Sequence, residues 1–338
     1  MKLKMVGIGL LLILIGFLGG WGVGQIQPAS WELLSPKGKQ EVSKPYDDFS
    51  LLKLASNENH PSNIEVVGEK FYYTSQGKKV SGAINVPIGT PPKGGFPVVV
   101  MLRGYVEKEV YTTGTGTKHA AEYFASKGYV TLAPDFLGYG ESDPEDENAI
   151  GARVQRPVTV LDLLASLGSL EFVNSQRVFI WGHSNGGQIA ISVIEILGKR
   201  GEDTGRIDPF RVLGVTLWAP VSKPFPYSIL YYTDEALDQG KWLRQQVAEF
   251  EKTYNAYDFS IDRYTTWINM PVQVHQGTAD EAVPEKWSKE LTDNLKNLDK
   301  EVNYFTYPGA DHNLSTGWGT VVRRDVQFFI ALEKEKAT

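Results

Sequence analysis

The glycine-rich turn Gly182-His183-Ser184-Asn185-Gly186-Gly187 holds a serine in a position where covalent chemistry is possible. It follows the apolar run 178–181 and precedes residues 188–197, in which apolar side chains recur with a helical period. A strand, a tight G-x-S-x-G turn and a helix form a nucleophile elbow, whose strained backbone exposes the serine hydroxyl. The flanking glycines leave room that a Cβ would fill. The pattern predicts Ser184 as a nucleophile; the alternative is a plain strand-to-helix turn.

A serine nucleophile needs a base within hydrogen-bond reach. Of the five histidines, only His275 and His312 follow Ser184, which is one order that such triads take. His275 lies inside the apolar strand pattern 272–276, where a packing role is expected. His312 lies in a glycine-containing loop after the last strand pattern, so we predict it to be the base. His183, inside the turn itself, suits shaping the elbow better than proton transfer.

The base in turn needs an acid that orients it. Asp280 follows the strand 272–276 and precedes Pro284, which is suited to the first turn of a helix. We predict Asp280 as the third catalytic residue, with the neighbouring Glu281 as the fallback. The alternative role for Asp280 is a helix-capping carboxylate. Asp311 is too close to His312 in sequence to orient it.

Two backbone N–H groups are expected to hold the oxyanion. One belongs to Asn185, directly after the nucleophile. The other belongs to Tyr105, in the loop after the apolar strand 97–102, and the Tyr105 hydroxyl is a possible further donor. Arg103, two residues earlier, is expected either to take part in this loop or to pair with an acidic segment.

The elements that must position these residues alternate between strands and helices. Helical patterns at 119–127, 157–170 and 285–298, with a closing helix that carries Val322 and Phe329, separate the later strands. This alternation predicts an α/β fold with a mostly parallel central sheet and helices on both faces. About eight strands are expected, at 64–74, 79–86, 97–102, 129–133, 178–181, 212–218, 272–276 and 303–306.

Residues 221–270 interrupt this alternation with an aromatic-rich segment that has no strand pattern. An excursion from the carboxyl end of a strand lies over the ligand side of an α/β sheet. We therefore expect a helical lid, with Tyr227, Tyr231 and Tyr232 in the substrate pocket. The alternative is a packed decoration away from the site.

Several ordered motifs resemble the α/β-hydrolase superfamily, and within it the catalytic domain of the prolyl oligopeptidase family and the related dienelactone-hydrolase-like esterases. They are Gly82–Val86 with Pro87, Phe96-Pro97, Arg103-Gly104, Pro134-Asp135 through Ser142, Gly182–Gly187, Gly277–Asp280 with Val283-Pro284, and His312. The resemblance implies an α/β-hydrolase fold and a Ser184–His312–Asp280 triad acting through an acyl-enzyme. Where that family usually has His-Gly, this chain has Arg103-Gly104.

The resemblance favours a serine peptidase that cleaves short peptides, whereas the small size and the aromatic insertion favour a carboxylesterase on a small acyl ester. A hypothesis of another class is a non-catalytic binding protein on a hydrolase fold. The net charge of −6 and the lack of a basic tract make nucleic acid an unexpected partner, and no cysteine is present. No metal or other cofactor is expected, and the sequence does not indicate an oligomeric state.

The amino terminus predicts a membrane segment at residues 1–24. Residues 5–23 are apolar and approach the roughly 20 residues that cross a hydrocarbon core. Lys2 and Lys4 precede them, which places the remainder outside the cytoplasm. We expect a single-pass anchor, a tether at 25–62 with a short helix near 49–54, and a catalytic domain at 63–338. The alternative is a cleaved signal peptide and a secreted protein.

Overall fold

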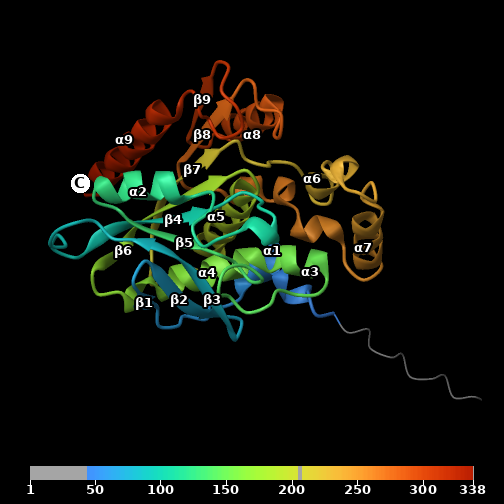
Figure 1. Cartoon of the computed structure of the whole chain (residues 1–338), viewed down its shortest axis with the longest axis horizontal. Helices are drawn as coiled ribbons and strands as arrows, with labels where there is room; N and C mark the ends of the chain where they lie inside the picture. The colour runs from blue at the N-terminus through green and yellow to red at the C-terminus, as the bar shows by residue number, and fades with distance from the viewer. Residues whose placement is uncertain (1–43, 205–207, 338) are drawn as a thin grey trace, which may run out of the picture. The chain divides into compact units, whose positions relative to one another are not determined.

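The computed structural model describes residues 44–204 and 208–337 (Figure 1). The predicted anchor, residues 1–24, and the first part of the predicted tether lie outside these ranges. Within them, no helix combines the length and the apolar character that a membrane crossing requires. The anchor therefore stays a prediction from the sequence.

One sheet of nine strands forms the centre of the described protein, in the order β1-β2-β3-β5-β4-β6-β7-β8-β9. The strands β1 to β3 and the β3–β5 pair are antiparallel, and the pairs from β5 through β4 to β9 are parallel. The predicted mostly parallel sheet is thus confirmed. The strand bounds are β1 Glu65–Val67, β2 Lys70–Ser75, β3 Lys78–Asn85, β4 Phe96–Leu102, β5 Val130–Pro134, β6 Val173–His183, β7 Val212–Trp218, β8 Val272–Gly277 and β9 Val302–Tyr307.

The count of nine strands, against about eight expected, comes from the segment 64–74. The sequence pattern suggested one strand there, but the chain turns back at Gly68 and forms β1 and β2 as an antiparallel pair. Gly68 has a φ of 62°, a left-handed conformation that glycine adopts without steric cost. The turn at Gly68 therefore divides this strand-like segment into two strands.

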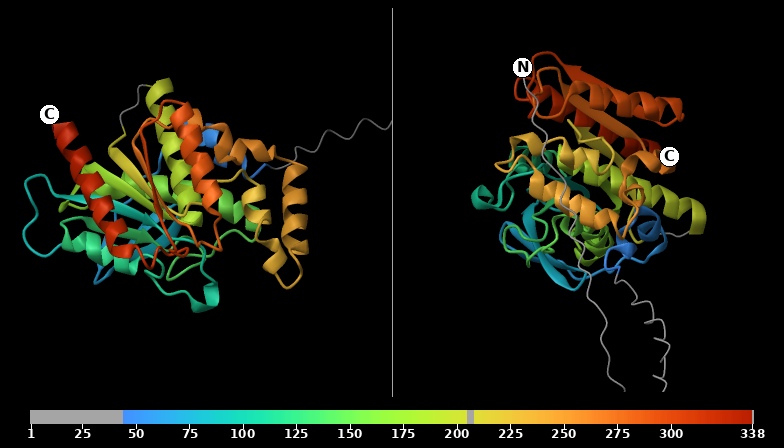
Figure 2. Two further views of the ribbon diagram at one scale, coloured as in Figure 1. Left: turned by 90° about the horizontal axis from the view of Figure 1, so that it is seen from above. Right: turned by 90° about the vertical axis from the view of Figure 1, so that its right-hand side faces the viewer.

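Helices cover both faces of the sheet, as Figures 1 and 2 show. One face packs against α1 (Leu51–Ser56), α4 (Arg156–Ser166), α5 (Asn185–Thr204) and α8 (Glu285–Asn297) through a large apolar cluster. The other face packs against α2 (Lys118–Ser126) and α9 (Trp318–Ala337). The strand β4 is buried along its whole length because both layers cover it.

The insertion 221–270 is helical in the structure, and it forms the lobe that carries α6 and α7 in Figure 1. It contains α6 (Tyr227–Leu230), α7 (Lys241–Glu251) and four short 3-10 turns. Its own apolar cluster, which includes Phe225 and Phe250, packs against Ile150 and Val154 of α3 (Ala149–Val154). This packing joins the insertion to the segment that enters α4.

The described part of the predicted tether, from residue 44 on, lies in the same compact unit as the predicted catalytic domain. The expected short helix is present as α1, and its Leu51 and Leu54 side chains are buried in the core. The guanidinium of Arg200 donates hydrogen bonds of 3.2 and 2.6 Å to the Leu54 carbonyl. Burial of these two leucines favours packing of the segment on the domain, since a solvated tether would leave them exposed to water.

A buried polar network joins α9 to the carboxyl ends of β7 and β8. The Asp325 carboxylate accepts hydrogen bonds from Thr216, from Trp218 Nε1 at 3.0 Å and from Gln273 Nε2 at 3.0 Å. His275 Nε2 lies 2.9 Å from the same carboxylate. The buried side chain of His275 therefore has a packing role, as its place inside a strand suggested.

Replacing Asp325 by alanine should leave several buried donors without an acceptor. We expect Asp325→Ala to lower the free energy of unfolding by about 3 kcal/mol or more, because each unsatisfied buried group retains its desolvation cost. Urea unfolding followed by circular dichroism measures this change. Asp293→Ala, at a half-exposed carboxylate paired with Lys289, is the control and should change stability far less. Equal losses in the two variants would contradict the structural role of the network.

Candidate active site

The turn at Ser184 has the geometry of a nucleophile elbow. Ser184 lies between the end of β6 and the start of α5, with a φ of 54° in the left-handed region that non-glycine residues rarely occupy. Its amide donates to the Trp218 carbonyl at 2.9 Å, and its carbonyl accepts from the Val221 amide at 3.0 Å. A Cβ on Gly186 would lie 1.9 Å from the Leu102 carbonyl oxygen, so glycine is required there.

The structure brings His312 and Asp280 into direct contact. His312 Nδ1 lies 3.0 and 2.9 Å from the two Asp280 carboxylate oxygens. Their loops are held together because the Ala279 amide donates to the Ala310 carbonyl at 3.0 Å and a Cβ on Gly277 would collide with that carbonyl. Since a carboxylate only accepts, Nδ1 carries the hydrogen and Nε2 is left as the basic atom.

Asp280 is held ionised by its partners. Burial by itself would raise its pKa, but hydrogen bonds from His312, from the Val283 amide and from the Gln276 side chain outweigh burial, and the net pKa is lowered. The side chain of Asp280 is fully covered from solvent. A buried anion at this position can fix the tautomer of His312 and stabilise a positive charge on it.

Gln276 is a positioning residue that the sequence pattern did not indicate. Its Nε2 donates to Asp280 at 2.9 Å, and its Oε1 accepts from Ser288 Oγ at 2.6 Å. The amide thus links the acid to helix α8. In the sequence, Gln276 is recognisable only as a polar residue at the end of an apolar strand. The neighbouring residues do not show which helix packs against it.

His183 lies behind the elbow and contacts the loop of His312. Its Nε2 is 3.0 Å from the His312 carbonyl oxygen, and the two rings lie 4.7 Å apart between centroids. Because a carbonyl only accepts, Nε2 carries the hydrogen. Burial, followed by the charge of His312, lowers the pKa of His183 to about 4. His183 is therefore neutral near pH 7, which fits the predicted role in shaping the elbow.

The lowered pKa of His183 predicts a pH-dependent stability. Between pH 6.5 and 4 the unfolded chain binds a proton at this residue and the folded chain does not, so stability present above pH 6.5 is lost as the pH falls. We expect the loss to be about 3 kcal/mol, from the difference between 6.5 and the folded pKa of about 4. Urea unfolding at pH 7, 5.5 and 4 measures it.

The variant His183→Asn should flatten the dependence on pH over this range, whereas His119→Gln, at an exposed histidine, should leave it unchanged. A slope that persists in His183→Asn would show that another group is responsible.

The predicted oxyanion donors lie on either side of Ser184. The Asn185 amide opens α5 and so has no acceptor within that helix. A Cβ on Gly104 would lie 3.0 Å from Ser184 Cβ, which places the loop of Tyr105 against Ser184. Among the residues that the structure describes, none accepts a hydrogen bond from the Tyr105 amide. Both amides are thus available near Ser184.

The side chain of Tyr105 points to a different partner. Its hydroxyl donates to Glu107 Oε2 at 2.9 Å, and the side chain is half exposed. Partial burial and then the bond to Glu107 raise the pKa of Tyr105 to about 12. The hydroxyl is therefore occupied, and the backbone amide is the group of this residue that remains for an oxyanion.

Replacing Tyr105 by phenylalanine separates these two groups. We expect Tyr105→Phe to keep kcat within about threefold of the parent, because the amide is unchanged, whereas loss of a true oxyanion donor costs about 100-fold or more. Steady-state hydrolysis of an activated ester measures this, with Glu107→Gln as the matched control. A fall of 100-fold in Tyr105→Phe alone would mean that the hydroxyl itself contacts the oxyanion.

Arg103 is held by aromatic rings and carbonyls rather than by a carboxylate. Its guanidinium carbon lies 4.3 and 4.1 Å from the ring centroids of Tyr111 and Tyr139. It donates to the Gly104 carbonyl at 2.9 Å and to the backbone carbonyl of Asp135 at 3.1 Å. The arginine thus braces the loop that carries Tyr105.

The three tyrosines expected in the substrate pocket gather around Trp287 of α8. The ring centroids of Tyr227, Tyr231 and Tyr232 lie 6.1, 4.7 and 6.4 Å from that of Trp287. None of the three lines the cavity that adjoins Asn185. Their place in a substrate pocket stays a prediction. Other residues of the insertion line this cavity.

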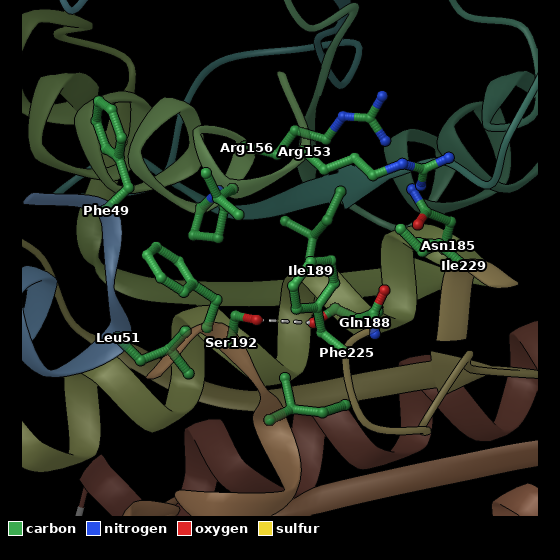
Figure 3. A pocket seen from close by; sticks show the side chains of 14 residues that line it. Phe49, Leu51, Arg153, Arg156, Asn185, Gln188, Ile189, Ser192, Phe225 and Ile229 are labelled. Carbon is green, nitrogen blue, oxygen red and sulfur yellow. Dashed lines mark hydrogen bonds between the residues drawn. The ribbon is translucent and has the colours of Figure 1, made fainter. Parts of the chain in front are cut away.

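That cavity, of about 60 Å³, lies beside the start of α5 (Figure 3). Its walls come from α1, α3, α4, α5 and the insertion. Fourteen residues line it: Phe49, Leu51, Arg153, Val154, Arg156, Pro157, Asn185, Gln188, Ile189, Ser192, Phe225, Ile229, Phe259 and Ile261. Among them, only Asn185 is a site residue predicted from the sequence. The spacing of Arg153 and Arg156 is compatible with one helix face, but nothing in the sequence indicates where that face points.

The described residues offer no metal centre. In residues 44–204 and 208–337, no group of three or more His, Cys, Asp or Glu side chains is placed to hold an ion.

Comparison with known proteins identifies the family. The family model described as "Alpha/beta hydrolase family" matches residues 104–322, a span that includes the loop of Tyr105, the elbow and the loop of His312. The chain belongs to the alpha/beta hydrolase family. A curated member, epoxide hydrolase 3 of Siraitia grosvenorii, is 32% identical over 96 residues, which is 28% of this chain and 26% of that protein. The chain thus matches about a quarter of the length of this relative.

Solved structures of an esterase and a peptidase resemble the described protein in fold. The acetyl xylan esterase from Paenibacillus sp. R4 matches with a TM-score of 0.59 and 18% identity, over 84% of this chain and 94% of that chain. Dipeptidyl peptidase 4 of Porphyromonas gingivalis matches with a TM-score of 0.53 and 19% identity, over 83% of this chain and 36% of that chain. Likeness at this identity shows the fold that these enzymes share with the chain.

Proposed function

We propose that this alpha/beta hydrolase is a serine hydrolase that acts through an acyl-enzyme. Ser184 Oγ attacks the acyl carbonyl carbon, and His312 Nε2 takes the serine proton and then gives it to the leaving group. Asp280 holds the imidazole in the required tautomer. The amides of Asn185 and Tyr105 stabilise the oxyanion. Water, activated by the same histidine, then releases the acyl group.

One observation carries this proposal: the contact of His312 Nδ1 with both oxygens of Asp280, beside an elbow that holds Ser184 at a φ of 54°. A helix-capping carboxylate would not need a histidine partner. Asp280 also accepts hydrogen bonds from the amides of Ala282 and Val283. These bonds fit the capping role, but capping does not explain the contact with His312.

Small acyl esters are the substrates that we favour over the short peptides to which the sequence motifs pointed. The cavity beside Asn185 is about 60 Å³, room for about four water-sized groups, which suits a short acyl chain. The likeness to the acetyl xylan esterase covers nearly all of that enzyme, whereas the likeness to dipeptidyl peptidase 4 covers 36% of that chain. A prolyl-oligopeptidase-like peptidase is the second candidate, because the same motifs serve peptide bonds.

We further propose that residues 1–24 anchor the hydrolase, with the catalytic domain outside the cytoplasm. The apolar segment 5–23 and the preceding Lys2 and Lys4 support this placement. Protease accessibility in intact spheroplasts tests it: cleavage of the catalytic domain without lysis is expected, and protection would contradict it.

Labelling with a fluorophosphonate probe tests the nucleophile. We expect the full chain in detergent to be labelled and to hydrolyse p-nitrophenyl acetate, and Ser184→Ala to lose both properties, because the alanine has no oxygen to attack. Ser192→Ala, at a serine further along α5 whose hydroxyl donates to the Gln188 carbonyl, is the matched control and should remain labelled. Labelling of Ser184→Ala would refute the assignment.

A parallel assay with proline-containing peptide amides ranks the two substrate classes. Faster cleavage of the amides would favour the peptidase. No labelling and no activity on either substrate would favour the binding protein on a hydrolase fold.

A further inference from the structure

Two cationic side chains line the cavity beside Asn185. Arg153 lies at the end of α3 and Arg156 at the start of α4, and both line the cavity. Figure 3 shows the two side chains on the same wall, both extending toward the side where Asn185 lies. Within residues 44–204 and 208–337, neither guanidinium forms a hydrogen bond or an ion pair.

The nearby carboxyl groups are committed elsewhere or uncharged. Glu145 pairs with Lys108, and Asp146 accepts hydrogen bonds from Tyr46 and Gln155. Glu195, farther along α5, is buried, and burial raises its pKa well above the usual range. None of the residues that line the cavity is acidic. The charge of Glu145 acts on both arginines from a distance. Among the described residues, however, no carboxylate pairs directly with either guanidinium.

The arginines keep this charge at neutral pH at an electrostatic cost. Burial and then the charge of Arg153 lower the pKa of Arg156 to about 10, and burial lowers the pKa of Arg153. Two like charges in a partly desolvated wall repel each other, and an anion between them would remove that repulsion. Arginine is suited to this because its planar fork binds a carboxylate through two hydrogen bonds.

The cavity begins at the residue that follows the proposed nucleophile. Asn185, whose amide is the proposed oxyanion donor, lines it, whereas Ser184, His312 and Asp280 do not. Because the base must face the leaving group, we assign the acyl group to this space, which adjoins the elbow and does not include the base. The apolar walls from Ile189, Phe225 and Ile229 suit the methylene chain of such a group.

We propose that Arg153 and Arg156 bind the carboxylate of a dicarboxylic half ester, with its acyl group of succinyl or similar length in this cavity. The proposal rests on the proposed serine hydrolase function. Ser184 Oγ bonds to the ester carbonyl carbon, the alkoxide leaves with the proton from His312, and the distal carboxylate is unchanged. Water then releases the free diacid.

Matched esters test the proposal in the full chain. Monoethyl succinate carries a carboxylate where ethyl 4-methylpentanoate carries an isopropyl group of similar shape. We expect kcat/KM for the succinate ester to exceed that for the neutral ester by at least about tenfold. Arg153→Gln and Arg156→Gln should each lower this ratio by about 10- to 100-fold, the loss that follows removal of one charge-assisted hydrogen bond.

Controls separate charge recognition from damage to the fold or to the chemistry. Hydrolysis of the neutral ester should persist in both arginine variants, because this ester carries no charge for them to bind. Lys289→Gln, which removes an exposed lysine outside the cavity lining, should leave the ratio unchanged. Arg153→Lys should restore part of the ratio. A parent ratio of one or less, or a ratio that both arginine variants leave unchanged, would overturn the proposal.

A binding measurement distinguishes failure of this inference from failure of the proposed function. Titration calorimetry of succinate into Ser184→Ala tests the arginine pair without catalysis. Binding that Arg153→Gln abolishes would support the anion site even if neither ester is cleaved, in which case the proposed hydrolase chemistry fails and the site remains. Absence of succinate binding in a folded Ser184→Ala variant would overturn the anion site whatever the hydrolysis assays show.

Discussion

The site depends on one strained residue, Ser184, whose left-handed backbone is held between three neighbouring strands. A non-glycine residue in this conformation costs about 1–3 kcal/mol, and it persists only where its surroundings hold it. The amide of Ser184 bonds to the last residue of β7, and its carbonyl accepts from the amides of Gly187 and Val221. Gly186, packed against the end of β4, closes the third side. The strain is thus held by the rigid centre of the sheet.

The charged groups of the site are placed by loops that grow from the same edge of this sheet. Asp280 follows β8 and His312 follows β9, and hydrogen bonds between the two loops fix their distance. Gln276 then ties the acid to α8, while neutral His183 fills the space behind the base. An ionised carboxylate, an oriented imidazole and an uncharged neighbour together create a basic nitrogen without a competing charge close to it.

The opposite side of the nucleophile has the reverse electrostatic character. There the walls come from the insertion, from α3 and α4, and from the segment before the first strand. Tyr46 joins these parts, because its amide donates to the Tyr254 hydroxyl at 2.9 Å and its own hydroxyl donates to Asp146 at 3.0 Å. Segments far apart in the chain therefore enclose one small space lined by two arginines that form no direct ion pair among the described residues. In the proposed hydrolase, the base on one side and the arginines on the other would fix the direction in which the substrate binds.

The amino-acid sequence by itself determined the parallel sheet and the candidates Ser184, Asp280 and His312. Each of these residues sits in a loop next to an apolar strand, and strand and turn patterns are local properties of the chain. The same local reasoning interpreted β1 and β2 as one strand, because the turn at Gly68 depends on which strand lies opposite.

Only the tertiary structure decided which residues line the cavity, that Gln276 supports Asp280, and that the predicted pocket tyrosines gather at Trp287. These are contacts between residues distant in sequence, and side-chain pairing across elements leaves no periodic signal in either partner.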